Sequence, residues 1–149
     1  MRRLVSIGAL FIVIVSAPLA VAKAPDYVPA LADIMTGAQF RHMKLWFAGK
    51  QKNWKLARYE LQQVTQSLDD AVSLYHGIPV EFVSATTDPL IAIGDAIKAE
   101  NVTQFKKGFN ELTTACNACH KAIGRDFIVI QVPTTQPFGN QSFTPSKAP

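Results

Sequence analysis

The feature that most limits how this chain can fold is the spacing of its apolar residues, which recur every three or four positions in four separate stretches. This spacing matches the α-helical turn of about 3.6 residues, so each stretch would present one apolar face to a shared interior. Glycine and proline separate the stretches, and no alternation of strands with helices is indicated. The chain is therefore predicted to be all-α, a four-helix bundle with an extended C-terminal tail.

Capping residues and helix breakers give the expected ends of the helices. The four helices are expected over residues 28–48, 53–75, 87–99 and 101–123. Gly49 is expected to end the first helix, and Asn53 to cap the second with its side chain. Asn101 would cap the fourth helix in the same way, and Gly124 would end it. The apolar segment 127–132 that follows is expected to lie extended across the bundle.

The fourth expected helix carries the pentapeptide Cys116-Asn117-Ala118-Cys119-His120, which has the CxxCH form of a haem c attachment sequence. Positions three apart share a helix face, so both thiols can reach the two vinyl groups on one edge of a porphyrin. His120 stands four positions after Cys116 and can swing its imidazole beneath the ring to bind iron. The pentapeptide predicts one covalent haem c, bound through Cys116 and Cys119 with His120 as the proximal iron ligand.

Three other interpretations of the cysteine pair stay open. A dithiol redox pair usually lies at a helix N-terminus after a strand, whereas this pair comes late in its helix. A zinc site needs four ligands, and on paper they would be Cys116, Cys119, His42 and His76. Chance occurrence of the pentapeptide is the third alternative.

The first residues have the order of a secretory signal peptide. Arg2 and Arg3 precede an apolar run from Leu4 to Val15, and Ala20-Val21-Ala22 supplies a small-residue cleavage site. The apolar run is shorter than the roughly 20 residues of a membrane-spanning helix, so no stable membrane span is expected after cleavage. Export agrees with the pentapeptide, because haem c is attached outside the bacterial cytoplasm. The chain is therefore predicted to be periplasmic.

Three parts of the chain follow from these features. We expect residues 1–22 to be removed as the signal peptide, residues 23–132 to form the four-helix haem-binding domain, and residues 133–149 to be the extended tail. Loss of Arg2 and Arg3 would lower the formal net charge from +4 to +2, and no run of Lys and Arg resembles a nucleic-acid footprint. We expect no nucleic-acid partner.

The chain resembles the class II c-type cytochromes, the group of cytochromes c′ and c556. The resemblance lies in the four-helix pattern, the late motif from Cys116 to His120, and the basic residue Arg125 after it. It covers most of residues 28–126 and implies a small bundle that binds one haem near its C-terminus. It also implies a distal residue supplied by the first helix, and an antiparallel homodimer. Family members usually end soon after the motif, whereas this chain runs on to Pro149.

The occupant of the second axial position on iron would decide what such a protein does. His42 lies on the apolar face of the first expected helix and is the first candidate for a distal iron ligand. Met35 lies on the same face one heptad earlier and is the alternative, and Met43 would serve if the helix were rotated. A lone histidine among apolar residues is more often a satisfied core residue, which would leave the site open.

Two strong axial ligands would favour one-electron transfer, so the first functional hypothesis is a periplasmic electron carrier that exchanges electrons with a redox partner protein. Five-coordinate iron would favour a protein that binds NO or CO. A redox subunit of a larger enzyme, docked through the tail, is the third hypothesis. Independent enzymatic catalysis is not expected, because no nucleophile–base pair or carboxylate dyad stands out.

Overall fold

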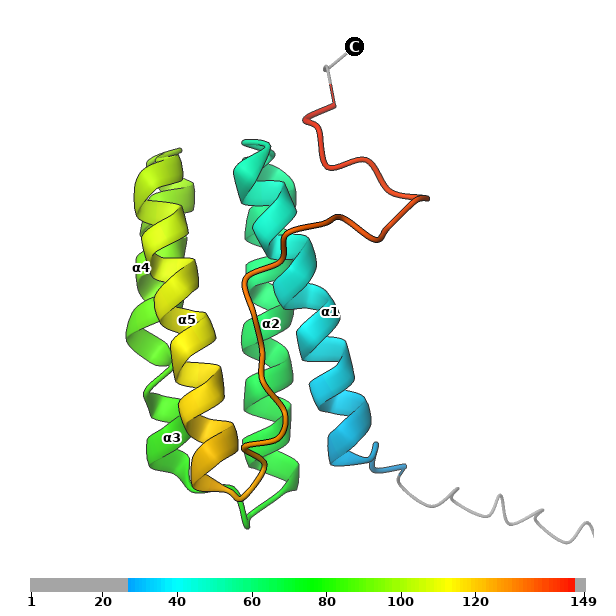
Figure 1. Ribbon diagram of the computed structural model, residues 1–149, viewed down its shortest axis with the longest axis vertical. Coiled ribbons are helices and arrows are strands. Elements are labelled where there is room, and N and C mark those ends of the chain that lie inside the picture. The colour runs from blue at the N-terminus through cyan, green and yellow to red at the C-terminus, as the bar shows by residue number, and fades with distance from the viewer. Residues whose placement is uncertain (1–26, 147–149) are drawn as a thin grey trace, which may run out of the picture.

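The computed structural model describes residues 27–146, and these form a bundle of four long helices with one short helix between the second and third of them (Figure 1). The helices are α1 (Leu31–Lys50), α2 (Trp54–Leu74), α3 (Val80–Ser84), α4 (Thr87–Lys98) and α5 (Val102–Ala122). Residues 27–146 contain no β-strand. The predicted all-α four-helix fold is confirmed, while the predicted signal peptide, residues 1–22, lies outside the described residues.

Two of the expected helix caps are present as hydrogen bonds. The Asn53 side-chain oxygen accepts from the Leu56 backbone N–H at 3.2 Å, and the Asn101 side-chain oxygen accepts from the Gln104 N–H at 3.0 Å. Each bond satisfies one of the backbone donors that a helix N-terminus leaves free. Gly124 follows the end of α5 with a φ of 68°, the left-handed conformation that glycine adopts at low cost.

Gly49 does not end the first helix, as the sequence suggested, but lies buried within α1. A Cβ atom at this position would collide with the ring of Phe105 on α5. The residue is therefore needed for the close approach of two helices, while the chain turns out of α1 only after Lys50. Composition alone does not distinguish these two uses of glycine.

The short helix α3 was not predicted, because the sequence of residues 76–86 indicated a linker between two helices. It begins after Pro79, whose fixed φ suits a helix start, and spans only five residues. The chain leaves it at Thr86, whose hydroxyl donates to the Val83 carbonyl at 2.6 Å. One helical turn is too short to show an apolar periodicity.

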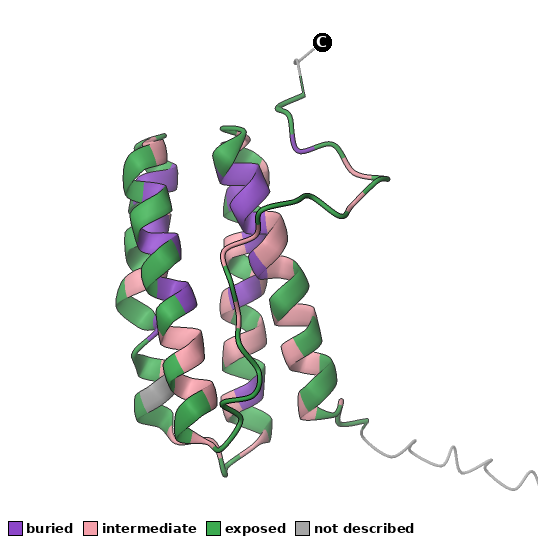
Figure 2. Cartoon of the chain, viewed as in Figure 1, coloured by how far each residue is buried: buried purple, intermediate pink, exposed green. Residues whose placement is uncertain are grey.

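Burial is uneven along the bundle. Most of the fully buried residues lie in the upper half of the view in Figure 2, where the C-terminal half of α1 meets the N-terminal half of α5. The large residues of this core are Leu45, Trp46, Phe47, Ile93, Ile97, Phe105, Phe109 and Leu112. Nearer the start of α1, the apolar side chains of Ile34, Met35 and Ala38 are only half-buried. The stripe predicted for the first helix is therefore fully buried only from His42 onward.

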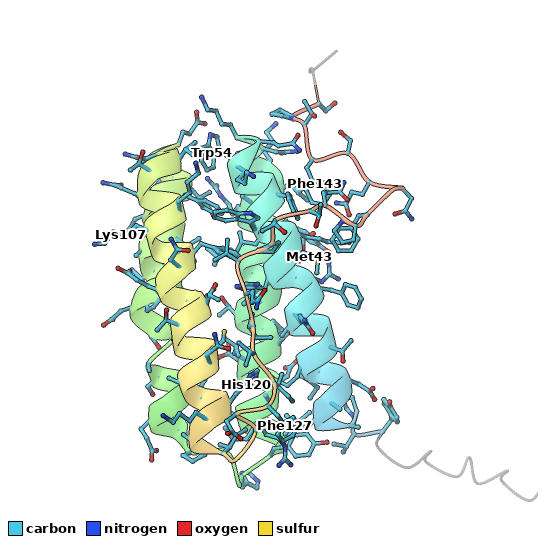
Figure 3. The ribbon with its side chains drawn as sticks, in the orientation of Figure 1. Met43, Trp54, Lys107, His120, Phe127 and Phe143 are labelled. Atoms are coloured by element: carbon cyan, nitrogen blue, oxygen red, sulfur yellow. The ribbon has the colours of Figure 1, made fainter. Side chains whose placement is uncertain are left out.

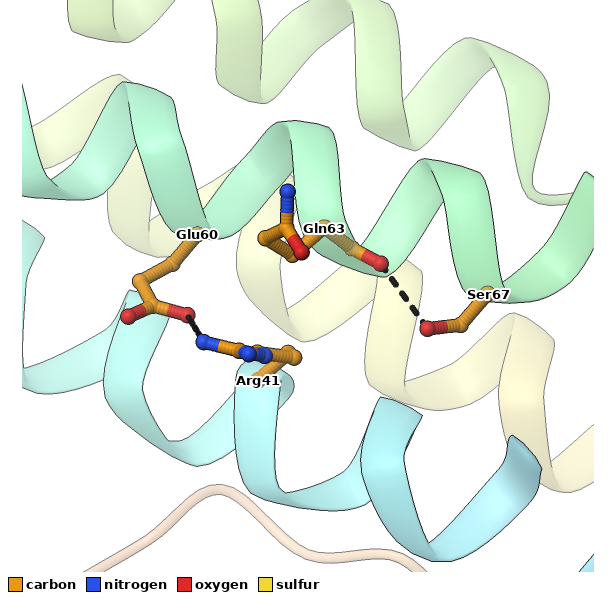
Figure 4. Close-up of polar contacts among 4 residues, drawn as sticks. All are labelled: Arg41, Glu60, Gln63 and Ser67. Atoms are coloured by element: carbon orange, nitrogen blue, oxygen red, sulfur yellow. Dashed lines mark hydrogen bonds and ion pairs between the residues drawn. The ribbon is translucent and has the colours of Figure 1, made fainter. Parts of the chain in front are cut away.

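A buried carboxylate that the sequence pattern did not reveal joins α1 to α2. Glu60 has a side chain 1% exposed, and one of its oxygens lies 3.3 Å from a guanidinium nitrogen of Arg41 (Figure 4). The Ser67 hydroxyl, about two turns further along α2, donates to the Gln63 carbonyl of its own helix at 2.9 Å. The ion pair therefore provides the polar link between the two helices in this region, and the serine is satisfied locally.

The C-terminal tail lies on the bundle in two parts. The first, residues 127–132, which we call the strap, runs alongside α5 and does not pack across the bundle as predicted, since Phe127, Ile128 and Val129 are exposed (Figure 1). The second part turns back to the loop between α1 and α2, where the ring of Phe143 lies 5.9 Å from that of Phe47. Phe143 is 2% exposed and belongs to the same core as the helices. Part of residues 133–149, which were predicted to form a separate tail, thus contributes to the interior of the domain.

Candidate functional site

The last turns of α5 bring the three residues of the predicted site to one region of the bundle. Cys116 and Cys119 stand three positions apart, and the chain places His120 directly after them. Cys116 packs against the hydrophobic core, whereas Cys119 and His120 are partly exposed. Figure 3 shows His120 on the side of α5 along which the tail runs. Both thiols are free, so each S–H could add across a vinyl double bond.

A backbone carbonyl orients the imidazole of His120. Its Nδ1 lies 2.8 Å from the carbonyl oxygen of Ile128 in the strap. A carbonyl can only accept, so Nδ1 carries a proton. In the neutral form of the ring, Nε2 then keeps its lone pair. Metal-bound histidines show this arrangement, because the N–H that is hydrogen-bonded fixes both the tautomer and the ring orientation. His120 is thus prepared to give Nε2 to a metal ion.

The environment of the thiols does not favour a dithiol redox pair. Burial, and then the charge of Cys119, raise the pKa of the Cys116 thiol from 9.0 to about 11. Burial also raises the pKa of the Cys119 thiol. Both groups are protonated at neutral pH, and the thiolate is the form that exchanges disulfides. Their position in the last turns of α5 leaves them without the positive helix end that activates such cysteines.

The four ligands proposed for a zinc site do not converge. In the part of the chain that the structure describes, no three His, Cys, Asp or Glu side chains surround a common point. His42 is instead occupied by a hydrogen bond to α5, and His76 lies two residues beyond the end of α2 with its surface exposed. The described residues therefore give no support to a four-ligand zinc site.

His42 is a buried residue that bridges α1 and α5. Its Nε2 lies 3.0 Å from Oγ1 of Thr113, whose hydroxyl itself donates to the Phe109 carbonyl at 2.8 Å. The threonine oxygen is therefore the acceptor and His42 Nε2 the donor. The imidazole packs against Phe109 with ring centroids 4.2 Å apart. Burial lowers the pKa of His42 from 6.5 to about 4, so the ring is neutral near pH 7.

The contact between His42 and Thr113 also sets the register of α1 against α5. The two helices run in opposite directions (Figure 1), so seven residues back along α1 correspond to seven residues forward along α5. Counted from that contact, Met35 corresponds in register to His120 and lies about 10 Å along α1 from His42, in the half of α1 that leans away from α5 (Figure 1). Met35 shares the helix face of His42 because the two are one heptad apart. Of the three distal candidates His42, Met35 and Met43, Met35 is the one that corresponds in register to His120.

Two residues that sequence reasoning missed complete the surroundings of His120. Asn117, between the cysteines, forms two hydrogen bonds with the backbone of Ile130, and Ile128 supplies the carbonyl for His120. The sequence pointed to this part of the chain through the apolar run after Gly124. That run predicted an extended segment but not its hydrogen bonds to Asn117 and His120. Lys121 in the last turn of α5 and Arg125 just beyond the helix are both exposed.

Comparison with known protein families, with curated proteins and with solved structures finds no match to this chain. Within residues 27–146, none of the helices combines the length and the apolar character needed to cross a membrane.

Proposed function

We propose that this protein is an exported, periplasmic c-type cytochrome that carries one haem c and transfers single electrons to and from a redox partner protein. Cys116 and Cys119 would hold the haem through two thioether bonds, and His120 Nε2 would be the proximal iron ligand. The haem, once bound, supplies an iron that cycles between two oxidation states. The protein supplies attachment, ligand orientation and an apolar environment.

The observation that carries this proposal is the hydrogen bond from His120 Nδ1–H to the Ile128 carbonyl. It leaves Nε2 available on a histidine that directly follows two free cysteines spaced by one helical turn. The elevated thiol pKa values and the scattered positions of His42 and His76 weaken the dithiol and zinc alternatives.

The proposal is tested by producing the full chain in bacteria that contain a haem c attachment system. The purified wild-type protein should keep its haem after denaturation and show the mass of the processed chain plus one haem. The matched control is the Cys116→Ser, Cys119→Ser double variant, which should fold but release any haem on denaturation. A wild-type protein without covalent haem would rule the proposal out.

For the distal position we favour Met35 over His42. Met35 corresponds in register to His120, whereas His42 lies about two turns away and already donates to Thr113. In the holoprotein, Met35→Ala should convert low-spin ferric haem to a high-spin absorption spectrum. His42→Ala should leave the spin state unchanged. A high-spin spectrum in His42→Ala with an unchanged spectrum in Met35→Ala would identify His42 as the distal ligand instead.

A second candidate function is the binding of NO or CO by five-coordinate iron. It is favoured by the apolar, half-buried side chains of Ile34 and Ala38, which flank Met35 on α1 and offer no strong ligand. The reduced holoprotein distinguishes the two functions. An immediate spectral shift when CO is added to the wild type supports gas binding, and a spectrum that resists CO supports electron transfer.

A further inference from the structure

Asn117 occupies a position in the pentapeptide that the attachment chemistry does not use, yet it makes a specific contact. Its side-chain Nδ2 donates to the Ile130 carbonyl at 2.8 Å, and its Oδ1 accepts from the Ile130 N–H at 2.7 Å. One amide side chain thus satisfies both backbone groups of one residue. This pairing fixes the strap in distance and in register, because a shift by one residue would break both bonds.

The spacing of these contacts is the one expected where an extended chain lies beside a helix. Asn117 and His120 are three apart and share one face of α5, while their partners Ile130 and Ile128 are two apart in the strap. Residues two apart in an extended segment lie on one side of it. The intervening Val129 is 62% exposed, against 42% for Ile128. Within residues 27–146, the side-chain hydrogen bonds to the strap come from Asn117 and His120 of the pentapeptide.

We propose that Asn117 is a positioning residue, which holds the strap in the register that presents the Ile128 carbonyl to His120 Nδ1. The inference rests on the proposed function insofar as His120 binds iron. Asn117 does not touch the metal or the reacting atoms. It acts through the strap, so that the amide sets the tautomer of the proximal histidine and the electron density that Nε2 gives to iron.

A shift of the strap has a defined consequence for iron. A histidine whose Nδ1–H is hydrogen-bonded is a more basic ligand and stabilises the ferric state. When the Ile128 carbonyl moves away, this stabilisation is lost and the reduction potential should rise. A purely structural role for Asn117 would lower stability and leave the potential unchanged.

The test compares Asn117→Ala with the wild type and with Thr114→Ala. Thr114 is a matched control, because it is exposed on α5 and its hydroxyl donates only to Asn110 of the same helix. In the holoprotein, Asn117→Ala should raise the midpoint potential and speed amide exchange at Ile130 by about tenfold, as for the loss of one hydrogen bond. Thr114→Ala should change neither. Wild-type values of both quantities in Asn117→Ala would overturn the proposal.

Two further measurements keep this inference separate from the proposed function. Asn117→Asp retains the acceptor for the Ile130 N–H and loses the donor, so it should fall between the wild type and Asn117→Ala in exchange rate. Nitrogen chemical shifts of His120 in the apoprotein report its tautomer without any haem. Loss of the Nδ1–H tautomer in Asn117→Ala supports the positioning role even if the wild type takes up no haem. Retention of that tautomer contradicts it.

Discussion

At the scale of single residues, the burial of His42 makes the stability of this protein depend on pH. The folded state holds the ring neutral between α1 and α5, with a pKa of about 4 against 6.5 for an exposed histidine. Between these two values the unfolded chain binds more protons than the folded one, so stability rises with pH through this window. Above pH 6.5 the penalty disappears, and below pH 4 it is complete.

The prediction is a loss of about 2 kcal/mol in the free energy of unfolding between pH 7 and pH 5 that is attributable to His42. Urea unfolding followed by circular dichroism at several pH values measures it. His42→Gln removes the titrating group and should flatten the pH dependence by about that amount. An equally steep slope in His42→Gln would show that other groups cause the acid sensitivity.

At the scale of elements, the contact between Arg41 and Glu60 joins α1 to α2 by a charge pair with one partner fully buried (Figure 4). Such a pair contributes little net stability when both partners are present, because each charge loses hydration. It becomes costly when one partner is removed, since the other remains buried and uncompensated.

Arg41→Met should therefore destabilise the protein by about 3–5 kcal/mol, more than an exposed arginine would. Replacing both residues, as Arg41→Met with Glu60→Met, should recover most of this loss because no charge is then left in the interior. Chemical denaturation of the two variants and the wild type measures the difference. If the double variant were as unstable as Arg41→Met, packing and not charge would explain the effect.

At the scale of the whole molecule, the tail is part of the core and not an appendage. Phe143 returns to the loop between α1 and α2, where Thr144 donates to the Gln51 side chain at 2.9 Å and its carbonyl accepts from Asn53 at 3.3 Å. The ring of Phe143 packs against the rings of Phe47 and Phe138. The interior of this domain is completed by residues that follow the last helix.

Phe143→Ala should cost about 3–5 kcal/mol, the usual penalty for removing a fully buried phenylalanine ring. Phe127→Ala is the matched control, because that ring belongs to the same tail but is 74% exposed, and its removal should cost far less. Thermal or urea unfolding of the two variants provides the comparison. Equal losses would indicate that the tail is held by its backbone and not by this ring.

The sequence predicted those features that depend on local rules. Asn53 and Asn101 were identified as caps because capping acts within one helical turn, and Gly124 because helices commonly end at glycine. Glu60, Phe143 and the contacts of Asn117 were not identified, since each depends on a partner supplied by another part of the chain. Cys116, Cys119 and His120 were selected by their spacing, and their role in haem binding stays a prediction.

The contacts of the tail differ greatly in the length of chain that they close, which has a consequence for the order of folding. The bonds from Asn117 and His120 to the strap close loops of 13 and 8 residues, whereas those near Thr144 close loops of 91 and 93 residues. Short loops close within about 10–100 ns, and long ones lose more chain entropy. We expect α5 and the strap to associate early, so that the proximal histidine is oriented before the two ends of the domain have met.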